Sequence, residues 1–255
     1  MVSQAEKSIE SKKPLKDWSN CRIGITGAKG SLGKALTKKL RSYGAFVIGL
    51  SHSKLTEEIK STDCPNEWLH WECGKEEELH EIFKSLDILI LNHGINPGGK
   101  INTKDLNQTL EVNAFSYWRL IEQFESISNQ IKTTSVREIW INTSEAEIQP
   151  ALSPGYEISK RLIGELISIK WSSLSKKKNK TLILRKLILG PFRSNLNPIG
   201  IMSPEVVATQ IINQIKLNFK LIIVTPNPIT YILVPLNELK RAIYFSFFNG
   251  SQKSN

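Results

Sequence analysis

Short, continuously apolar segments alternate with longer segments of helical periodicity along most of the chain. Strands that alternate with helices form right-handed βαβ units, so the pattern predicts a parallel sheet with helices on both faces. The strand candidates are apolar throughout rather than at every second residue, which is typical of strands buried on both faces. The predicted strands are 22–26, 45–50, 68–72, 86–91, 138–142, 181–187 and 221–224. The predicted helices are 31–43, 75–84, 104–130, 154–175, one that begins near 203–205, and 236–248.

Length and composition bound the domain organisation. Of the 255 residues, 40% are hydrophobic and 23% are charged, which is typical of a soluble globular protein. The sequence contains no run of about 18 consecutive apolar residues, which argues against a membrane-spanning helix. We predict a single domain at residues 21–250, preceded by a flexible tail at 1–20 and followed by a disordered end at 251–255.

Cysteine usage and charge narrow the class of protein. The three cysteines are odd in number and form no CxxC pair, which disfavours a disulfide framework and a zinc site. Residues 1–20 lack the apolar core of a signal peptide, so we expect a cytoplasmic protein. The net charge is +10, but its densest basic run, Lys176–Lys180, lacks the interleaved aromatic residues of a single-strand binder. We interpret that run as a solvated loop and expect no nucleic-acid partner.

A glycine-rich turn joins the first predicted strand to the first predicted helix. Its sequence from Thr26 to Gly33 is TGAKGSLG, with glycines at GxxGxxG spacing. Glycine lets the chain turn sharply and lets main-chain N–H groups approach a pyrophosphate, which then lies at the positive end of the helix. The turn therefore predicts a dinucleotide-binding Rossmann fold, a doubly wound α/β sheet between two helical layers. The residues expected to contact the cofactor here are Gly27, Ala28, Lys29, Gly30, Ser31, Leu32 and Gly33.

The end of the second predicted strand indicates which nicotinamide cofactor is bound. A carboxylate at this position normally accepts the ribose 2′-hydroxyl of NAD. Here the strand ends in Ser51, His52, Ser53 and Lys54, with no carboxylate. Hydroxyls, an imidazole and an ammonium accept a 2′-phosphate that a carboxylate would repel, and Lys29 adds a second cation. We therefore expect NADP(H) to be preferred, with NAD(H) as the alternative.

Tyr156 and Lys160 share one face of a predicted helix, because they are four residues apart. An ammonium beside a phenol favours the phenolate, so we expect the pKa of Tyr156 to fall and the residue to act as a general acid or base. Further polar residues follow predicted strands, at the edge where parallel sheets bind ligands. These are Asn92, His93 and Gly94 after the fourth strand, Asn113 on the helix that follows, and Ser144 after the fifth strand.

Together these motifs resemble those of the short-chain dehydrogenase/reductase family. The shared features are the TGxxGxxG turn, the Asn92–His93–Gly94 motif, Asn113, Ser144, the Tyr156/Lys160 pair and Gly190–Pro191, all in family order. The chain length and the position of Asn113 are similar to those of the single-domain branch of this family. The GxxGxxG spacing is more typical of the extended, epimerase-like branch, whose chains are longer and carry a C-terminal substrate domain.

The resemblance implies a role for each matching residue. Tyr156 would give a proton to a carbonyl oxygen as hydride reaches the carbon, and Ser144 would hydrogen-bond that oxygen. Lys160 would hold the nicotinamide ribose and lower the pKa of Tyr156, and Asn113 would keep a water that links Lys160 to solvent. The other implied cofactor contacts are Glu72 and Cys73 at the adenine, Asn92, His93, Gly94 and Ile95 at the adenosine ribose, and Pro191 and Phe192 at the nicotinamide amide. His93 has no second ligand at useful spacing, so no metal site is expected.

The predicted activity is hydride transfer between NADP(H) and a carbonyl or secondary alcohol, in the reductive direction. The loop at 190–203 and the segment at 221–248 are mostly apolar, so we expect a small hydrophobic or lipid-like substrate. The C-terminal segment either packs on the domain or makes a peripheral membrane contact. Two other hypotheses stay open, a non-catalytic NADP-binding scaffold or sensor and the reductase module of a larger membrane-associated lipid-modifying protein. The family resemblance also implies a homo-oligomer, either a dimer or a tetramer.

Overall fold

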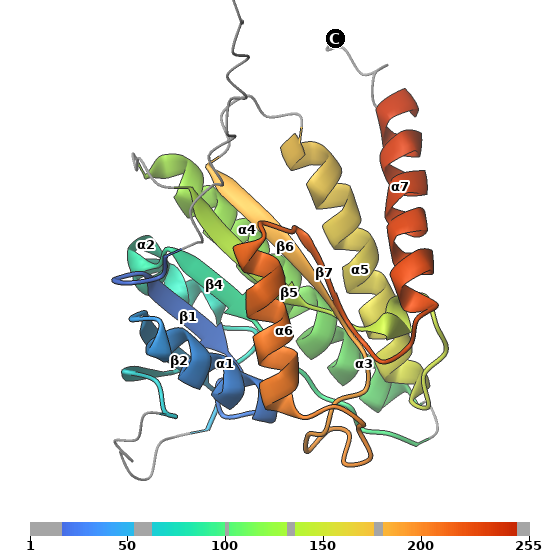
Figure 1. Ribbon diagram of the computed structural model, residues 1–255, viewed down its shortest axis with the longest axis horizontal. Coiled ribbons are helices and arrows are strands. Elements are labelled where there is room, and N and C mark those ends of the chain that lie inside the picture. The colour runs from blue at the N-terminus through green and yellow to red at the C-terminus, as the bar shows by residue number, and fades with distance from the viewer. Residues whose placement is uncertain (1–16, 54–62, 100–101, 132–135, 176–180, 249–255) are drawn as a thin grey trace, which may run out of the picture.

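Seven parallel strands form one sheet in the order β3-β2-β1-β4-β5-β6-β7 (Figure 1). The computed structural model describes residues 17–53, 63–99, 102–131, 136–175 and 181–248. The sheet confirms the predicted doubly wound α/β fold. Its strands are β1 (Arg22–Thr26), β2 (Phe46–Ser51), β3 (Glu67–His70), β4 (Ile88–Leu91), β5 (Arg137–Asn142), β6 (Leu182–Leu189) and β7 (Leu221–Val224). Lys54, the run Lys176–Lys180 and most of the two predicted terminal segments lie outside the described residues.

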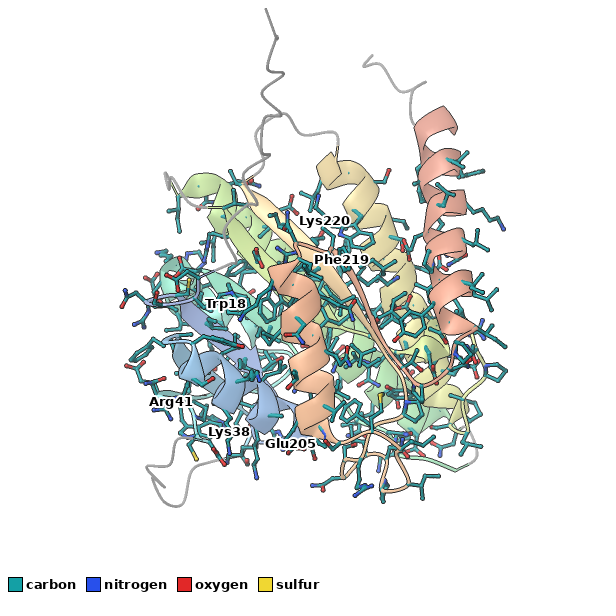
Figure 2. The ribbon with its side chains drawn as sticks, viewed as in Figure 1. Trp18, Lys38, Arg41, Glu205, Phe219 and Lys220 are labelled. Atoms are coloured by element: carbon teal, nitrogen blue, oxygen red, sulfur yellow. The ribbon has the colours of Figure 1, made fainter. Side chains whose placement is uncertain are left out.

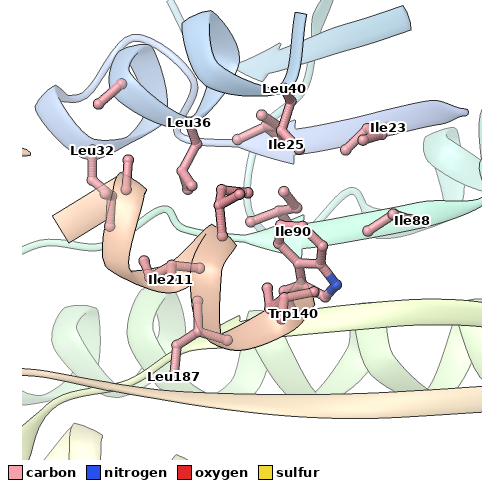
Figure 3. Close-up of a cluster of buried hydrophobic side chains, with 14 of the residues drawn as sticks. Ile23, Ile25, Leu32, Leu36, Leu40, Ile88, Ile90, Trp140, Leu187 and Ile211 are labelled. Atoms are coloured by element: carbon pink, nitrogen blue, oxygen red, sulfur yellow. The ribbon is translucent and has the colours of Figure 1, made fainter. Parts of the chain in front are cut away.

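Helices cover both faces of the sheet, and each face has its own hydrophobic core. The helices are α1 (Ser31–Ser42), α2 (His80–Ser85), α3 (Thr103–Leu110), α4 (Ser116–Gln130), α5 (Pro154–Ser175), α6 (Pro204–Lys216) and α7 (Thr230–Phe248). One core lies under α1 and α6, where Leu36 and Ile211 pack against strand residues such as Ile25 (Figure 3). The other core lies under α2, α4 and α5 and takes the alternate residues of the same strands.

Three helices differ from the sequence prediction. The helix expected at 75–84 begins as a 3-10 turn, η1 (Glu76–Leu79), and the one expected at 104–130 is divided by a π-helical turn, η2 (Glu111–Phe115). The last helix begins at Thr230 rather than at residue 236, because Asn227 closes a turn before it by accepting the N–H of Ile229 at 3.1 Å. Pro235 removes one hydrogen bond from this helix without ending it. In the described part of the chain, no helix is both long and apolar enough to span a bilayer.

The strand order reverses between β1 and β4, which is where doubly wound sheets bind ligands. Thr26, at the carboxyl end of β1, ties the two strands together through its hydroxyl. Its Oγ1 accepts the N–H of Asn92 at 2.9 Å and lies 2.8 Å from Nδ1 of His93. The glycine-rich turn after β1 and the segment after β4 therefore meet at one point of the carboxyl edge.

The body of the domain begins before residue 21, where the sequence analysis placed its start. Trp18 is 1% exposed and lies in the core under α1 and α6 (Figure 2). Its ring centroid is 5.5 Å from that of Tyr43 and 6.0 Å from that of Trp140. The carbonyl of Trp18 also accepts the N–H of Cys21 at 3.0 Å. The predicted tail was thus too long. The buried ring of Trp18 is enough to hold the polar segment around it against the domain.

We expect Trp18→Ala to lower the free energy of unfolding by about 3–5 kcal/mol, the usual cost of truncating a buried aromatic side chain. Urea denaturation followed by circular dichroism measures this change. Ser19→Ala, on the exposed neighbour of Trp18, is the matched control and should stay within about 0.5 kcal/mol of the unmodified chain. Equal stability of the two variants would show that residues 17–20 do not belong to the domain.

Candidate active site

Ser144, Tyr156 and Lys160 come together beside the carboxyl end of β5. Ser144 is 9% exposed and begins the 3-10 turn η3 (Glu145–Glu147), where its Oγ accepts the N–H of Ala146 at 3.2 Å. Ser144 also lies close enough to Tyr156 on α5 to lower the pKa of its phenol. One turn further along α5, the Nζ of Lys160 lies 5.6 Å from the centroid of the Tyr156 ring. The structure therefore assembles the three residues that the sequence placed in one crevice.

Burial sets the charge states of the tyrosine and the lysine. The expectation that the pKa of Tyr156 falls was wrong, because burial raises this pKa and the hydrogen bond from Ser144 opposes the rise only in part. Burial also lowers the pKa of Lys160 from 10.5 to about 8, against an opposing attraction from Glu147. At neutral pH the protein without ligand therefore holds Tyr156 as a phenol, with the Lys160 ammonium beside it.

The Lys160 ammonium has few partners for a buried charge. Its Nζ donates to the carbonyl of Asn142 at 3.3 Å and lies 5.4 Å from the ring centroid of Tyr117. The side-chain amide of Asn142 in turn donates to Oδ1 of Asn92 at 2.9 Å, and Asn92 donates to the carbonyl of Gly27 at 3.3 Å. A chain of hydrogen bonds thus links Lys160 to the glycine-rich turn.

Asn113 lies at the centre of the π-helical turn that the sequence analysis did not foresee. Its Oδ1 accepts the N–H of Ile95, and its Nδ2 donates to the carbonyl of Ile95, both at 2.9 Å. The same Nδ2 donates to Oγ of Ser159 on α5 at 3.1 Å. A Cβ at Gly94 would come within 3.1 Å of Oδ1, so the segment after β4 fits closely around this amide. π-Helical turns often mark functional positions, and here the turn holds that segment to α5. The water-holding role of Asn113 stays a prediction.

The glycine-rich turn has the shape that a dinucleotide phosphate requires. Gly27 has φ +63°, and a Cβ there would lie 2.8 Å from the Cα of His93. A Cβ at Gly33 would lie 2.4 Å from the carbonyl oxygen of Gly27. Gly30 begins α1 without a capping side chain, which leaves N–H groups of the first turn free to bind an anion. Ala28 and Leu32 point into the core, so they can offer a cofactor mainly their main chain, whereas the side chain of Ser31 is partly exposed.

The predicted 2′-phosphate contacts also lie together. Nζ of Lys29 donates to Oγ of Ser53 at 2.7 Å and to its carbonyl at 3.1 Å. The hydroxyls of Ser51 and Ser53 are 3.2 Å apart, and His52 is exposed beside them. Lys54 lies outside the described residues. An ammonium and two hydroxyls therefore meet at the end of β2, as the sequence predicted.

His93 serves packing rather than a cofactor through its ring. The imidazole lies between the rings of Trp71 and Tyr117, at centroid distances of 5.1 and 4.5 Å. Burial lowers its pKa to about 3, so the ring is neutral. The hydroxyl of Tyr117 donates to the carbonyl of His93 at 2.6 Å. Only the main chain of His93 is left to line an adenosine ribose.

The remaining predicted cofactor contacts lie at the two ends of the crevice. Glu72 pairs on the surface with Lys75 at 3.0 Å. Burial raises the pKa of Cys73, so its thiol is a poor nucleophile. At the other end, the carbonyl of Pro191 accepts the N–H of Ile201 at 3.0 Å, and Phe192 packs on the core under α1 and α6. No contact between either pair and Tyr156 is seen among the described residues, and the cofactor contacts of both pairs stay predictions.

A buried ion cluster behind the site was missed by the sequence analysis. Lys186 of β6 is 1% exposed, and its Nζ lies 2.6 Å from a carboxylate oxygen of Glu147 and 2.8 Å from one of Glu238 on α7. Glu147 lies at the end of η3, three residues after Ser144. A Cβ at Gly164 of α5 would lie 2.1 Å from the Glu147 carboxylate, so a side chain at this position would displace the carboxylate.

Two signals in the sequence could have indicated this cluster. Lys186 is a charged residue inside an otherwise apolar strand, and a charge buried in a sheet needs a partner. Ser144 and Glu147 form an S-x-x-E pattern, which often caps a helical turn and brings the glutamate back towards its start. Neither signal identifies Glu238, which the fold brings from the far end of the chain.

We expect Lys160→Met to stabilise the protein at pH 7 by about 1–3 kcal/mol while abolishing activity. The folded pKa of Lys160, about 8, lies below its ordinary value of 10.5, so folding carries the cost of a buried ammonium below pH 8. The unmodified chain regains this stability as the pH rises from about 8 towards 10.5, and the advantage of the variant should shrink over that range. Urea denaturation at several pH values measures both effects.

Lys170→Met is the matched control on the same helix. The Lys170 ammonium pairs with Glu125 at 2.6 Å, so its removal should not stabilise the protein. If Lys160→Met were less stable than the unmodified chain at pH 7, the inference that the buried Lys160 ammonium destabilises the fold would be wrong.

Solved structures with a similar fold include two short chain dehydrogenases. The one from Burkholderia cenocepacia, in complex with NADP, has a TM-score of 0.73 at 14% identity and covers 91% of this chain and 98% of its own. The one from Leptospira borgpetersenii serovar Hardjo-bovis, with bound NAD+, has a TM-score of 0.65 at 18% identity and covers 88% and 97%. At these identities the likeness shows the fold alone.

A curated relative is more similar in sequence. The chain is 38% identical over 229 residues to a monoglucosyldiacylglycerol epimerase of Synechocystis sp.. The match covers 89% of this chain and 54% of the relative. The chain thus spans about half the length of this curated relative.

The sequence model of the NAD dependent epimerase/dehydratase family matches residues 23–164, a range that holds the glycine-rich turn, Ser144, Tyr156 and Lys160. This family is related to the short-chain dehydrogenases whose motifs the sequence resembles. The GxxGxxG spacing, rather than the chain length, therefore indicated the family that matches. The chain belongs to the NAD dependent epimerase/dehydratase family.

Proposed function

We propose that this chain supplies the hydride-transfer domain of an epimerase that inverts one secondary-alcohol carbon in the sugar of a glycolipid. The observation that carries the proposal is the position of the buried Tyr156 phenol, close enough to Ser144 for that residue to lower its pKa and with the Lys160 ammonium 5.6 Å from its ring centroid. The substrate class is supported by the 38% identity to a monoglucosyldiacylglycerol epimerase. Because the chain spans about half of that relative, the proposal concerns the hydride-transfer step and leaves room for further parts.

Epimerisation at such a carbon involves no net oxidation or reduction. The C–H hydride leaves one face of the carbon and the alcohol becomes a ketone. After the ketone has turned, the hydride returns to the opposite face. A bound nicotinamide supplies the acceptance and return of the hydride. The protein must therefore move one proton off the substrate oxygen and back onto it.

We assign this proton transfer to Tyr156. Its phenolate would take the proton of the substrate hydroxyl as the C–H bond breaks, and the phenol would return it when the bond forms again. Ser144 would donate a hydrogen bond to the same substrate oxygen and stabilise the charge that develops there. With a pKa of about 8, Lys160 is mostly protonated at pH 7, and its ammonium lowers the cost of the phenolate.

The carbonyl reduction predicted from the sequence is one half of this cycle. A dehydrogenase would release the ketone, or take one up, and would change the redox state of the cofactor with each turnover. An epimerase keeps the ketone bound and leaves the cofactor pool unchanged. The two activities share Tyr156, Ser144 and Lys160, and only the fate of the ketone separates them.

We expect the purified chain to convert monoglucosyldiacylglycerol into an isomer of equal mass with a nicotinamide cofactor present below the substrate concentration. Proton NMR of the sugar and absorbance of the reduced cofactor follow the reaction. Tyr156→Phe should lower the rate by about 10²–10⁴-fold, because it removes the group that moves the proton. Tyr244→Phe, on an exposed part of α7, is the matched control.

The other outcomes point to the other hypotheses. Accumulation of a ketone with an equal amount of reduced cofactor would identify a dehydrogenase. Cofactor binding with no conversion of the glycolipid or of any carbonyl would favour the non-catalytic scaffold.

We also propose that NADP(H) is preferred over NAD(H). The Lys29 ammonium is already held by Ser53 at the end of β2, and residues 51–53 contain no carboxylate that would repel a 2′-phosphate. We expect Lys29→Ala to weaken NADPH binding by about tenfold, the loss of one charge-assisted hydrogen bond, and to leave NADH binding unchanged. Quenching of the six tryptophans measures both affinities.

Lys34→Ala is the matched control, because it removes an exposed cation from the same end of α1 without touching Ser53. An equal loss of NADPH affinity in both variants would show that Lys29 acts only through the net positive charge of this region and not through a specific contact with the 2′-phosphate. Tighter binding of NADH than of NADPH would overturn the preference itself.

A further inference from the structure

Three consecutive segments at the catalytic edge expose large apolar side chains. They follow the carboxyl ends of β5, β6 and β7, and in Figure 1 all three lie along the lower edge of the view. Leu152 is 93% exposed, Ile199 79% and Ile201 70%, far more than the core residues beside them. We define the apolar rim as Leu152, Leu196, Ile199, Ile201, Ile229 and Ile232.

The exposure of Ile199 and Ile201 is built into their loop. Gly200 between them is buried against the main chain of Phe192, where a Cβ would lie 2.0 Å from a carbonyl carbon. The N–H of Ile201 donates to the carbonyl of Pro191 at 3.0 Å, which fixes the main chain of the loop at this residue. With the glycine turned inward and tied down, the side chains on either side are directed to solvent.

The same segments are depleted of charge. Residues 149–155, 191–203 and 225–237 contain one charged side chain, Arg193, whereas 23% of the whole chain is charged. A water-exposed loop in a chain of this composition would normally carry several charges. An exposed apolar patch without them marks a surface that meets a membrane or another protein.

The location of the rim argues for a bilayer rather than a second copy of the chain. The rim borders the edge where Ser144 and Tyr156 lie, so a protein partner seated on it would cover the entrance to the site. A bilayer seated on it would present a glycolipid to that entrance. Charge agrees, because Arg193 is a cation and the chain carries a net charge of +10, both complementary to anionic headgroups.

We infer that the catalytic edge docks on the surface of an anionic bilayer, with the apolar rim inserted at the level of the headgroups and upper acyl chains. The sugar of a glycolipid would then reach Tyr156 while its acyl chains stay in the bilayer. The choice of glycolipid as the delivered molecule rests on the proposed function, whereas the docking itself rests on exposure and charge. Isoleucine and leucine side chains inserted in this way, with nearby cations, are the pattern of peripheral membrane binding.

Vesicle flotation tests the inference with vesicles of phosphatidylcholine containing about one-third phosphatidylglycerol. The unmodified chain should float with them and bind more weakly to phosphatidylcholine alone. Changing Ile199→Asp and Ile201→Asp together should weaken vesicle binding by at least about tenfold, because two apolar contacts become anions facing an anionic surface. A nucleotide titration of each variant verifies that it is folded.

The matched control changes Leu239→Asp and Ile243→Asp together, on the part of α7 that runs away from the catalytic edge (Figure 1). This variant should float like the unmodified chain. Loss of binding in the control, alone or equally with the rim variant, would overturn the catalytic edge as the docking surface. Failure of the unmodified chain to float, or a dimer that the rim variant abolishes, would overturn the bilayer as the occupant. The readout needs no turnover, so an inactive chain that floats would refute only the proposed function.

Discussion

The ammonium of Lys186 is enclosed in the middle of the fold, and its need for counter-charges joins the elements that carry the active site. It contacts Glu147 at 2.6 Å, Glu238 at 2.8 Å and the carbonyl of Gly164 at 3.1 Å. An unpaired charge at this depth would cost several kcal/mol, so β6, η3, α5 and α7 must close on one another as the chain folds. Ser144 and Tyr156 lie on two of these elements, and their relative position therefore depends on this cluster.

In the candidate site, burial disfavours the charged forms of two groups, the Tyr156 phenolate and the Lys160 ammonium. Burial raises the pKa of Tyr156 and lowers that of Lys160, so the same exclusion of water acts on both in opposite directions. Among the described residues, Lys160 receives a carbonyl hydrogen bond, contacts with two aromatic rings and an attraction from Glu147 in return. A buried ammonium of this kind lowers the stability of the fold. Active sites commonly show such a trade-off, in which a residue that lowers stability is kept for its chemical role.

The cofactor side and the substrate side of the crevice are built differently. The cofactor side uses main chain, with Gly27 and Gly33 packed so closely that no side chain fits, and Asn92 and Asn142 linking it to Lys160. The proposed substrate side consists of the apolar, almost uncharged segments after β5, β6 and β7. The first construction suits a pyrophosphate of fixed shape, and the second suits a molecule that is largely hydrocarbon.

By itself the sequence determined the sheet and its parallel strands, and it indicated the residues of the candidate site, because each depends on local signals. Apolar runs mark strands, glycine spacing marks the phosphate turn, and a spacing of four places Tyr156 and Lys160 on one helix face. The tertiary structure decided what depends on neighbours distant in the chain. It buried Trp18, turned the His93 ring inward, paired Lys186 with Glu147 and Glu238, and raised the pKa of Tyr156 that proximity to Lys160 was expected to lower. The physical reason is that water exclusion and charge pairing are properties of the assembled interior, and no local pattern contains them.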